Sequence, residues 1–175
     1  MKRVIIFWDH SNFQITLDGL MKRELGGRKS FDYAEFAKAL QGGNDLIKIY
    51  FACSAEELDI TMQGFYDSVD TKPFFYVKQF ERSMRGAEKQ VDVYLATQMV
   101  ALAYENAYDI AYLVSGDEDY LPAIEIVQQK GKIVAAVSAN ESISSRLKRR
   151  ADQYILIDDN ASERMKPYLW RNFVK

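Results

Sequence analysis

Three acidic residues follow directly on an apolar segment in the second half of the chain. The segment IAYLV, residues 110–114, leads through a Ser-Gly turn into Asp117, Glu118 and Asp119. Carboxylates this close together repel one another, and each raises the pKa of its neighbours. Such a stretch at the end of a buried strand indicates either that water disperses the charge or that a cation is bound there.

Two further aspartates are predicted to lie beside this acidic turn. Asp9 follows the apolar run 3–8, and Asp92 stands near the start of a helical pattern. In an open α/β sheet, ligands bind outside the carboxyl ends of the strands, so aspartates from these three segments are expected at one edge. Carboxylate oxygens favour Mg²⁺ or Mn²⁺, which activate water and stabilise the charge on a phosphodiester under attack. The candidate metal ligands and catalytic residues are Asp9, Asp92, Asp117 and Asp119.

The same aspartates also fit purely structural roles. Asp9 can end a strand and cap the next helix, and Asp92 is favourable near a helix N-terminus because of the helix dipole. Asp117 and Asp119 can serve as turn and N-cap residues. The shared edge of the predicted sheet favours one site over four independent structural roles.

Three other polar residues flank this edge. Asn12 can hold the loop or a ligating carboxylate, and it can equally cap a helix. Ser115 can offer its hydroxyl to a phosphate or belong to a structural turn. His10, the single histidine of the chain, is predicted to pack in the loop after the first strand rather than contact a substrate.

Composition and short motifs exclude several classes of protein. Among 175 residues there are 23 basic and 25 acidic residues but one cysteine, Cys53. Neither an internal disulfide nor a zinc site rich in Cys and His is therefore expected, and a reducing cytoplasm is the expected location. No apolar run approaches the roughly 20 residues that span a bilayer, so no membrane association is predicted. Walker and G-x-G-x-x-G motifs are absent, which argues against nucleotide hydrolysis on a phosphate-binding loop.

Apolar runs alternate with helical patterns along the chain. The predicted strands are 3–8, 46–52, 73–80, 110–115, 132–138 and 153–157. The predicted helices are 33–40, 54–69, 91–106, 119–130 and 141–151. Ser54 and Glu57 are expected to begin the second of these helices as a capping box, and Gly131 is expected to end the fourth.

This alternation predicts a three-layer, Rossmann-like α/β fold with a mostly parallel sheet of five or six strands and helices on both faces. The near-continuous apolar strands agree with burial on both faces of the sheet. Residues 1–175 are predicted to form one domain, with a core over about 3–158 and a helical tail over 159–175. In that tail, 162–173 resembles an amphipathic helix that packs on its own domain or forms a homodimer contact.

Four sequence blocks resemble the signature blocks of a known family. They are FWDHSNF (7–13), KQVDVYLATQMVALA (89–103), AYLVSGDEDYLPAIEIVQQKGKIVAAV (111–137) and SSRLKRRADQYILI (144–157). Together they resemble NYN domains, and more narrowly the LabA-like (DUF88) branch of the PIN-like nuclease superfamily, from residue 3 to about 158. The resemblance implies a PIN-like fold, acidic residues that bind Mg²⁺ or Mn²⁺, and ribonuclease activity.

The resemblance also assigns positions. Asp9 matches the acid of the first strand, Asp92 the aspartate of the Lys-x-Val-Asp-Val block, and the Ser-Gly-Asp-x-Asp block supplies Asp117 and Asp119. Asn12 and Ser115 match the polar residues that accompany them. Two positions depart from the family pattern, since His10 replaces a small residue and Gln98 replaces a frequent second acid.

Basic residues then gain an expected role in binding RNA phosphates, with affinity that falls as salt rises. The basic candidates for substrate binding are Arg82, Arg85, Lys89, Lys148 and Arg149, beside the polar candidates Asn12 and Ser115. Single-stranded RNA is the expected substrate, because a narrow rim admits an extended strand more easily than a duplex.

Three hypotheses follow from these residues. The first is a metal-dependent ribonuclease, for which the family resemblance implies products with a 5′-phosphate and a 3′-hydroxyl. The second is a catalytically weak or inactive RNA-binding domain, which Gln98 favours. The third is a phosphatase acting on small nucleotides, which needs no basic surface.

The combined change of Arg82, Arg85 and Lys89 to Ala separates the first hypothesis from the third. A ribonuclease that uses these cations loses most of its cleavage of RNA, whereas hydrolysis of a small phosphate ester stays at the wild-type rate. Parallel assays on a single-stranded RNA and on p-nitrophenyl phosphate check this expectation. Equal loss on both substrates would contradict a role confined to the RNA backbone.

Overall fold

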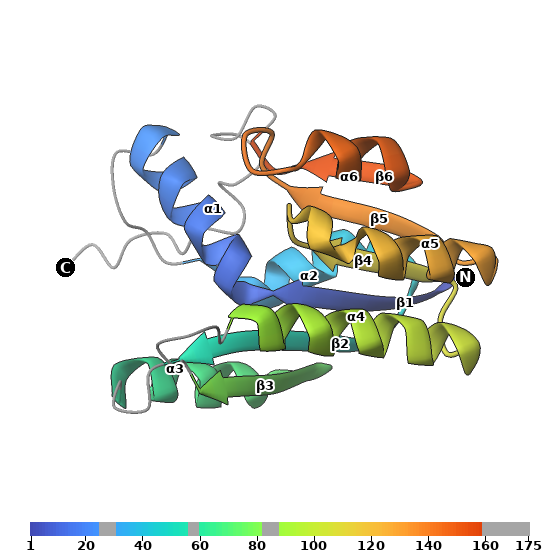
Figure 1. Ribbon diagram of the computed structural model, residues 1–175. Helices are drawn as coiled ribbons and strands as arrows, with labels where there is room; N and C mark the ends of the chain where they lie inside the picture. The colour runs from blue at the N-terminus through green and yellow to red at the C-terminus, as the bar shows by residue number, and fades with distance from the viewer. Residues whose placement is uncertain (25–30, 56–59, 82–87, 159–175) are drawn as a thin grey trace.

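The computed structural model describes residues 1–24, 31–55, 60–81 and 88–158, and Figure 1 shows a single sheet between two layers of helices. The strands are β1 (Arg3–Asp9), β2 (Asp45–Ala55), β3 (Phe75–Glu81), β4 (Ile110–Val114), β5 (Ile133–Ser138) and β6 (Gln153–Leu156). The helices are α1 (His10–Glu24), α2 (Tyr33–Gln41), α3 (Ile60–Asp70), α4 (Glu88–Tyr104), the 3-10 helix η1 (Glu118–Tyr120), α5 (Leu121–Gln129) and α6 (Ser145–Arg150).

The sheet has the strand order β3-β2-β1-β4-β5-β6, and every neighbouring pair is parallel. The chain moves outward from β1 to β3, crosses back through α4 to β4 beside β1, and then moves outward on the other side. Strand order therefore reverses between β1 and β4, which is where open α/β sheets bind their ligands. The predicted three-layer α/β fold with a parallel sheet is confirmed.

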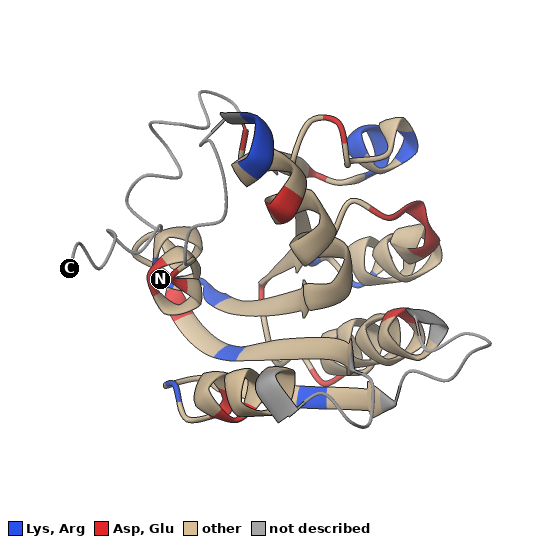
Figure 2. Cartoon of the chain, turned by 90° about the vertical axis from the view of Figure 1, so that its left-hand side faces the viewer, with Lys and Arg blue, Asp and Glu red and all other residues tan. Residues whose placement is uncertain are grey.

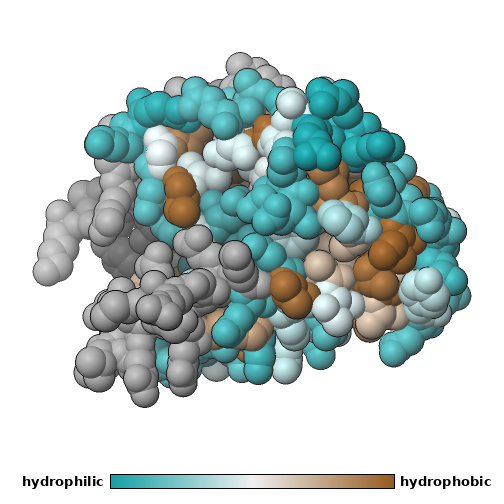
Figure 3. Space-filling view, in the orientation of Figure 1, coloured by the Kyte–Doolittle hydropathy of each residue, from teal (hydrophilic) through white to brown (hydrophobic). Residues whose placement is uncertain are grey.

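Alternate residues of the central strand face the two helical layers. Ile6 and Trp8 belong to the core with α1, α2 and α3, whereas Ile5 and Phe7 belong to the core with α4, α5 and α6. Burial on both faces explains why β1 is apolar without alternation. On the face that carries α4 and α5, exposed hydrophobic residues form patches among hydrophilic ones (Figure 3).

Two local predictions were wrong. Helix α1 is absent from the predicted set, because 10–24 contains Thr16, Asp18 and Gly19, which are weak helix formers; burial of its apolar face stabilises it instead. Ser54 lies within β2 rather than at a helix N-cap, and its amide donates to the Ser11 hydroxyl at 3.3 Å.

Helix ends elsewhere follow the expected chemistry. Gly131 ends the predicted helix 119–130 in a left-handed conformation with φ 74°, as expected from glycine at this position. Helix α6 begins at Ser145, later than predicted, because Ser144 caps it by accepting from the amide of Arg146. Glu57 and the predicted helix 162–173 lie outside the described residues. In the described ranges, no helix is long and apolar enough to cross a membrane.

The side chain of His10 is enclosed by aromatic rings at the start of α1. Only 2% of the residue is exposed, and within the described part of the chain its Nδ1 has no hydrogen-bond partner. The rings around it, with centroids 4.7–5.7 Å away, are Tyr33, Phe51, Phe65 and Tyr66. His10 therefore packs in the core rather than in a loop, on the sheet face that carries α1, α2 and α3.

Replacement of His10 by Leu is expected to flatten the acid dependence of stability. Burial lowers the pKa of His10 to about 3, so below the ordinary value of 6.5 the unfolded chain binds a proton that the folded chain excludes. The folded state loses stability as pH falls from 6.5 towards 3, up to about 2 kcal/mol between pH 7 and 5. Urea unfolding at both pH values measures the difference between wild type and variant.

The matched control is Phe13→Leu, which removes a buried ring from the same helix but no titratable group. Its cost in unfolding free energy is expected to be the same at pH 7 and pH 5. An equal cost of the His10 change at both values would contradict a neutral, enclosed imidazole.

Candidate metal centre

The predicted aspartates meet at the point where the strand order reverses. Asp9 is the last residue of β1, and the loop from Ser115 to Asp117 follows β4, which pairs with β1. Asp92 reaches the same place from the second turn of α4. Figure 2 shows the acidic loop after β4 between α4 and the basic helix α6.

Asp9 is held in place by donors from three segments. Its Oδ1 accepts from the amide of Asn12 at 3.0 Å, as an N-cap of α1 does, while its Oδ2 accepts from the Tyr120 hydroxyl at 3.2 Å and faces the Ser115 hydroxyl at 3.5 Å. Burial raises the pKa of Asp9 to about 7, against the opposing effect of the Asn12 amide, and the charge of Asp92 raises it further. Asp9 is thus both a structural cap and a carboxyl with an altered proton affinity.

Tyr120 connects two of the predicted site residues. Its hydroxyl lies 3.2 Å from Asp9 Oδ2 and 3.1 Å from Asp92 Oδ1, and its ring is fully buried. A hydroxyl carries a single proton, so it donates to one carboxylate at a time. Burial, together with the charges of Asp117 and Asp119, raises the pKa of Asp92, and the Tyr120 hydroxyl opposes that rise.

Sequence reasoning gave Tyr120 no role, although it directly follows the acidic turn. The signal that points to it is its place at the end of η1, three residues after Asp117. That spacing brings a side chain back toward the loop that begins the helix.

Backbone amides fix the loop after β4. The Gly116 amide donates to Asn12 Oδ1 at 3.0 Å, and the Asp117 amide donates to the Ser115 hydroxyl at 3.3 Å. Asp117 in turn caps η1 by accepting from the amide of Asp119 at 3.0 Å. Asn12 and Ser115 therefore position the loop that carries the two aspartates.

Gly116 allows this loop to pack directly against the loop after β5. A Cβ at Gly116 would lie 2.1 Å from the carbonyl oxygen of Ser142, a distance that excludes every side chain. The carbonyl of Gly116 also accepts from the Ser144 amide at 2.9 Å. The two loops are consequently joined by backbone contacts.

Three carboxylates form a cluster suited to a metal ion. Asp92, Asp117 and Asp119 each offer an oxygen, and these oxygens lie within 4.8 Å of one another. Asp9 is not one of these three ligands, but the Tyr120 hydroxyl links its carboxylate to that of Asp92. An all-carboxylate donor set suits Mg²⁺ or Mn²⁺ rather than zinc, and a cation there offsets the mutual repulsion of the charges.

A small cleft of about 100 Å³ opens beside the cluster. Its lining residues are Asp9, Ser11, Asn12, Ile15, Val91, Asp92 and Asp117. Ile15 is 71% exposed, so the cleft has one apolar wall at its mouth. Gln98, one of the two positions that depart from the family pattern, lines neither this cleft nor the larger pocket near α6.

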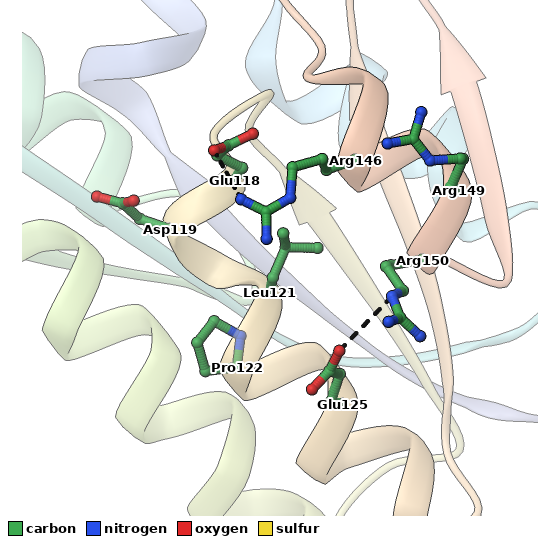
Figure 4. A pocket seen from close by; sticks show the side chains of 8 residues that line it. All are labelled: Glu118, Asp119, Leu121, Pro122, Glu125, Arg146, Arg149 and Arg150. Carbon is green, nitrogen blue, oxygen red and sulfur yellow. Dashed lines mark hydrogen bonds and ion pairs between the residues drawn. The ribbon is translucent and has the colours of Figure 1, made fainter.

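That larger pocket, of about 490 Å³, lies between α5 and α6 and shares Asp119 with the metal cluster. The residues that line it are Glu118, Asp119, Leu121, Pro122, Glu125, Arg146, Arg149 and Arg150, drawn in Figure 4. Arg146 pairs with Glu118 at 3.2 Å and Arg150 with Glu125 at 3.6 Å. Arg149 forms no ion pair with any described residue.

The other basic candidates lie elsewhere. Lys148 donates to Asn140 Oδ1 at 2.5 Å and does not line the arginine pocket. Lys89 lies in the first turn of α4, whereas Arg82 and Arg85 lie outside the described residues. Arg146 was not among the predicted substrate-binding residues. It belongs to the same basic run, RLKRR (146–150), as the predicted residues Lys148 and Arg149.

Comparison with known proteins gives a family and a fold. The family model described as NYN domain matches residues 3–158. No curated protein matches the chain. A crystal structure of a protein of unknown function from Vibrio parahaemolyticus is similar with a TM-score of 0.73 at 22% identity, covering 96% of both chains. This likeness supports the fold alone.

Replacement of Tyr120 by Phe is expected to destabilise the metal-free protein more at pH 8 than at pH 5. The hydroxyl lowers the pKa of both Asp9 and Asp92, so its loss raises both and penalises the ionised forms that prevail at high pH. A hydrogen bond to a charged group contributes about 1.5–3 kcal/mol. Urea unfolding in EDTA at both pH values gives the measurement.

Tyr108→Phe provides the control, because the Tyr108 hydroxyl is equally buried but donates to the neutral carbonyl of Met99 at 2.7 Å. The loss of unfolding free energy caused by Tyr108→Phe is expected to be independent of pH. A cost of Tyr120→Phe that does not change with pH would show that the hydroxyl does not act on the carboxylates.

Proposed function

This chain belongs to the NYN domain family, and on that basis we propose that it is a metal-dependent ribonuclease that hydrolyses phosphodiester bonds in single-stranded RNA. The family lies within the PIN-like nuclease superfamily, and the sequence blocks resemble its LabA-like branch. The observation that carries the proposal is the cluster of Asp92, Asp117 and Asp119, whose oxygens lie within 4.8 Å of one another at the switch point of the sheet.

The donor set fits Mg²⁺ or Mn²⁺, with Asp92, Asp117 and Asp119 as the residues that would hold it. A bound divalent cation supplies Lewis-acid stabilisation of a phosphodiester and lowers the pKa of a coordinated water. The charges that raise the pKa of Asp92 are the ones that favour a cation in this place. Asp9 is linked to Asp92 through the Tyr120 hydroxyl, and burial raises its pKa to about 7.

The remaining residues of the centre position these groups. The Asp9 carboxylate and the amide side chain of Asn12 tie the start of α1 to the loop after β4. The Ser115 hydroxyl supports the amide of Asp117. Rigid placement of several ligands matters because small displacements reduce both affinity and rate.

Arginine side chains beside the aspartate cluster can bind the phosphates of the substrate. Because Asp119 belongs both to the cluster and to the arginine pocket, a strand with one phosphodiester at the aspartates brings a neighbouring phosphate to the pocket. Arg149, which has no ion pair among the described residues, is the first contact, and Lys148, which precedes it on α6, lies outside the pocket and contacts Asn140. The products carry a 5′-phosphate and a 3′-hydroxyl.

Gln98 favours a second function, RNA binding with little or no catalysis. The glutamine stands on α4, six residues after Asp92, where related domains often carry an acid. An amide there supplies no charge for a second cation.

Replacement of Asp117 by Asn tests the enzyme. Wild type is expected to cleave a mixed single-stranded RNA with Mn²⁺ or Mg²⁺ and not with EDTA, and the variant to be slower by about 100-fold or more. Gel analysis of end-labelled RNA measures both rates. Asp67→Asn on α3 removes an exposed carboxylate from the opposite layer and is expected to leave the rate unchanged.

Equal cleavage by wild type and Asp117→Asn would assign the activity to a contaminant and reject the proposal. RNA binding without cleavage by folded wild type would favour the binding domain instead.

A further inference from the structure

One face of the edge strand β3 is covered by none of the helices in the described part of the chain. Phe75 and Val77 point into the core with α3, whereas Tyr76 and Lys78, the alternate residues, are exposed. Helix α4 packs over β1 and β2. Within the described part of that helix, Tyr94 is the one residue whose aromatic ring contacts a ring on β3, that of Phe80. The uncovered surface therefore lies beside α4 on the same side of the sheet (Figure 1).

Aromatic rings and lysines alternate on this surface, which we call the aromatic–lysine platform. Its residues are Lys48, Tyr50, Tyr76, Lys78, Phe80 and Tyr94. The ring centroids of Tyr50 and Tyr76 lie 5.9 Å apart, and those of Phe80 and Tyr94 lie 5.6 Å apart. Tyr76 is 42% exposed, which leaves part of a ring open to solvent.

Each pair of rings has an ammonium group beside it. Lys48 Nζ lies 5.0 Å from the Tyr76 ring centroid and 5.8 Å from that of Tyr50, and Lys78 Nζ lies 5.6 Å from the Phe80 ring. Neither lysine forms an ion pair with a residue in the described ranges. Both charges are thus available to an anionic ligand that also offers flat apolar groups.

Single-stranded nucleic acid has this combination of groups. Proteins that bind it place aromatic rings under successive bases and cations along the phosphates. Strand pairing with a protein partner is less favoured here, because the outward amide of Val77 on β3 already donates to Asp70 Oδ1 at 2.9 Å. That contact occupies a donor that an added strand would need.

The platform is continuous with the candidate metal centre. Phe80 pairs in register with Ser54, and the Ser54 hydroxyl lies 3.2 Å from that of Ser11, which lines the cleft. Tyr94 lies on the side of α4 that faces β3, where its ring packs against Phe80. A strand that leaves the cleft on this side passes over Phe80 and Tyr94 first.

We propose that the aromatic–lysine platform binds single-stranded RNA next to the cleft and stacks its bases on Tyr76 and Phe80. This inference rests on the proposed ribonuclease function and adds a binding surface opposite to the arginine pocket. Tyr76 and Phe80 are four residues apart on one strand, a span of about 13 Å at 3.3 Å per residue. The platform thus has room for about two bases.

The test compares two double variants with the same chemistry. Tyr76→Ala with Lys48→Gln removes one ring and one ammonium from the platform. Tyr104→Ala with Lys130→Gln removes an equivalent pair at the far end of α4, where Lys130 Nζ lies 3.7 Å from the centroid of the Tyr104 ring. Fluorescence anisotropy with a labelled 12-nucleotide RNA, in EDTA so that the strand stays intact, measures the dissociation constants.

The platform variant is expected to bind this RNA about 10-fold or more weakly, and the control variant within twofold of wild type. Hydrolysis of bis(p-nitrophenyl) phosphate with Mn²⁺, a substrate too small to reach β3, is expected to persist and shows that the cleft is intact. RNA affinity equal to wild type would overturn the platform while leaving the ribonuclease proposal in place.

A second variant guards against loss of the fold. Lys48→Gln with Lys78→Gln removes two charges but no aromatic ring, and the slope of log Kd against log salt is expected to fall by about 1.4, near 0.7 for each lost phosphate contact. An unchanged slope would overturn the platform. Wild type that hydrolyses the small ester but neither binds nor cleaves RNA would reject RNA as the substrate, and the platform with it.

Discussion

The buried carboxyl of Asp9 determines how the segments around the centre are arranged. At 3% exposure, a carboxyl is stable only if it is hydrogen-bonded or neutralised. Its partners come from α1, from the loop after β4 and from η1, so one side chain sets the orientation of three segments. Because strand order reverses beside it, these segments diverge and leave the cleft between them.

Much of this arrangement follows from local sequence. Strand ends and an acidic turn are local features, and they suffice to predict that Asp9 and the later aspartates lie at one edge of the sheet. The role of Tyr120 does not follow from such local features alone, since it depends on the packing of η1 against α4, which brings the Tyr120 hydroxyl to Asp92. Helix α1 was missed for a similar reason, because packing rather than intrinsic propensity stabilises it.

Charge is divided between two adjoining surfaces. The aspartate cluster repels anions unless a cation is present, whereas the pocket beside it carries Arg146, Arg149 and Arg150. Glu118 and Glu125 each pair with one of these arginines, and both ion pairs are exposed, so each contributes little to stability. Exchange of a carboxylate partner for a phosphate is thus a small energetic step at this surface.

Gly116 connects the loop of the aspartate cluster to the helix that carries the arginines. Its carbonyl binds the amide of Ser144, the N-cap of α6, and the Ser144 hydroxyl donates to Glu118 at 2.7 Å. The loop with the aspartates and the helix with the arginines are therefore one body, and a shift of Asp117 carries α6 with it. The spacing between the carboxylates of the cluster and the guanidinium groups of α6 is therefore set by hydrogen bonds rather than by a flexible connection.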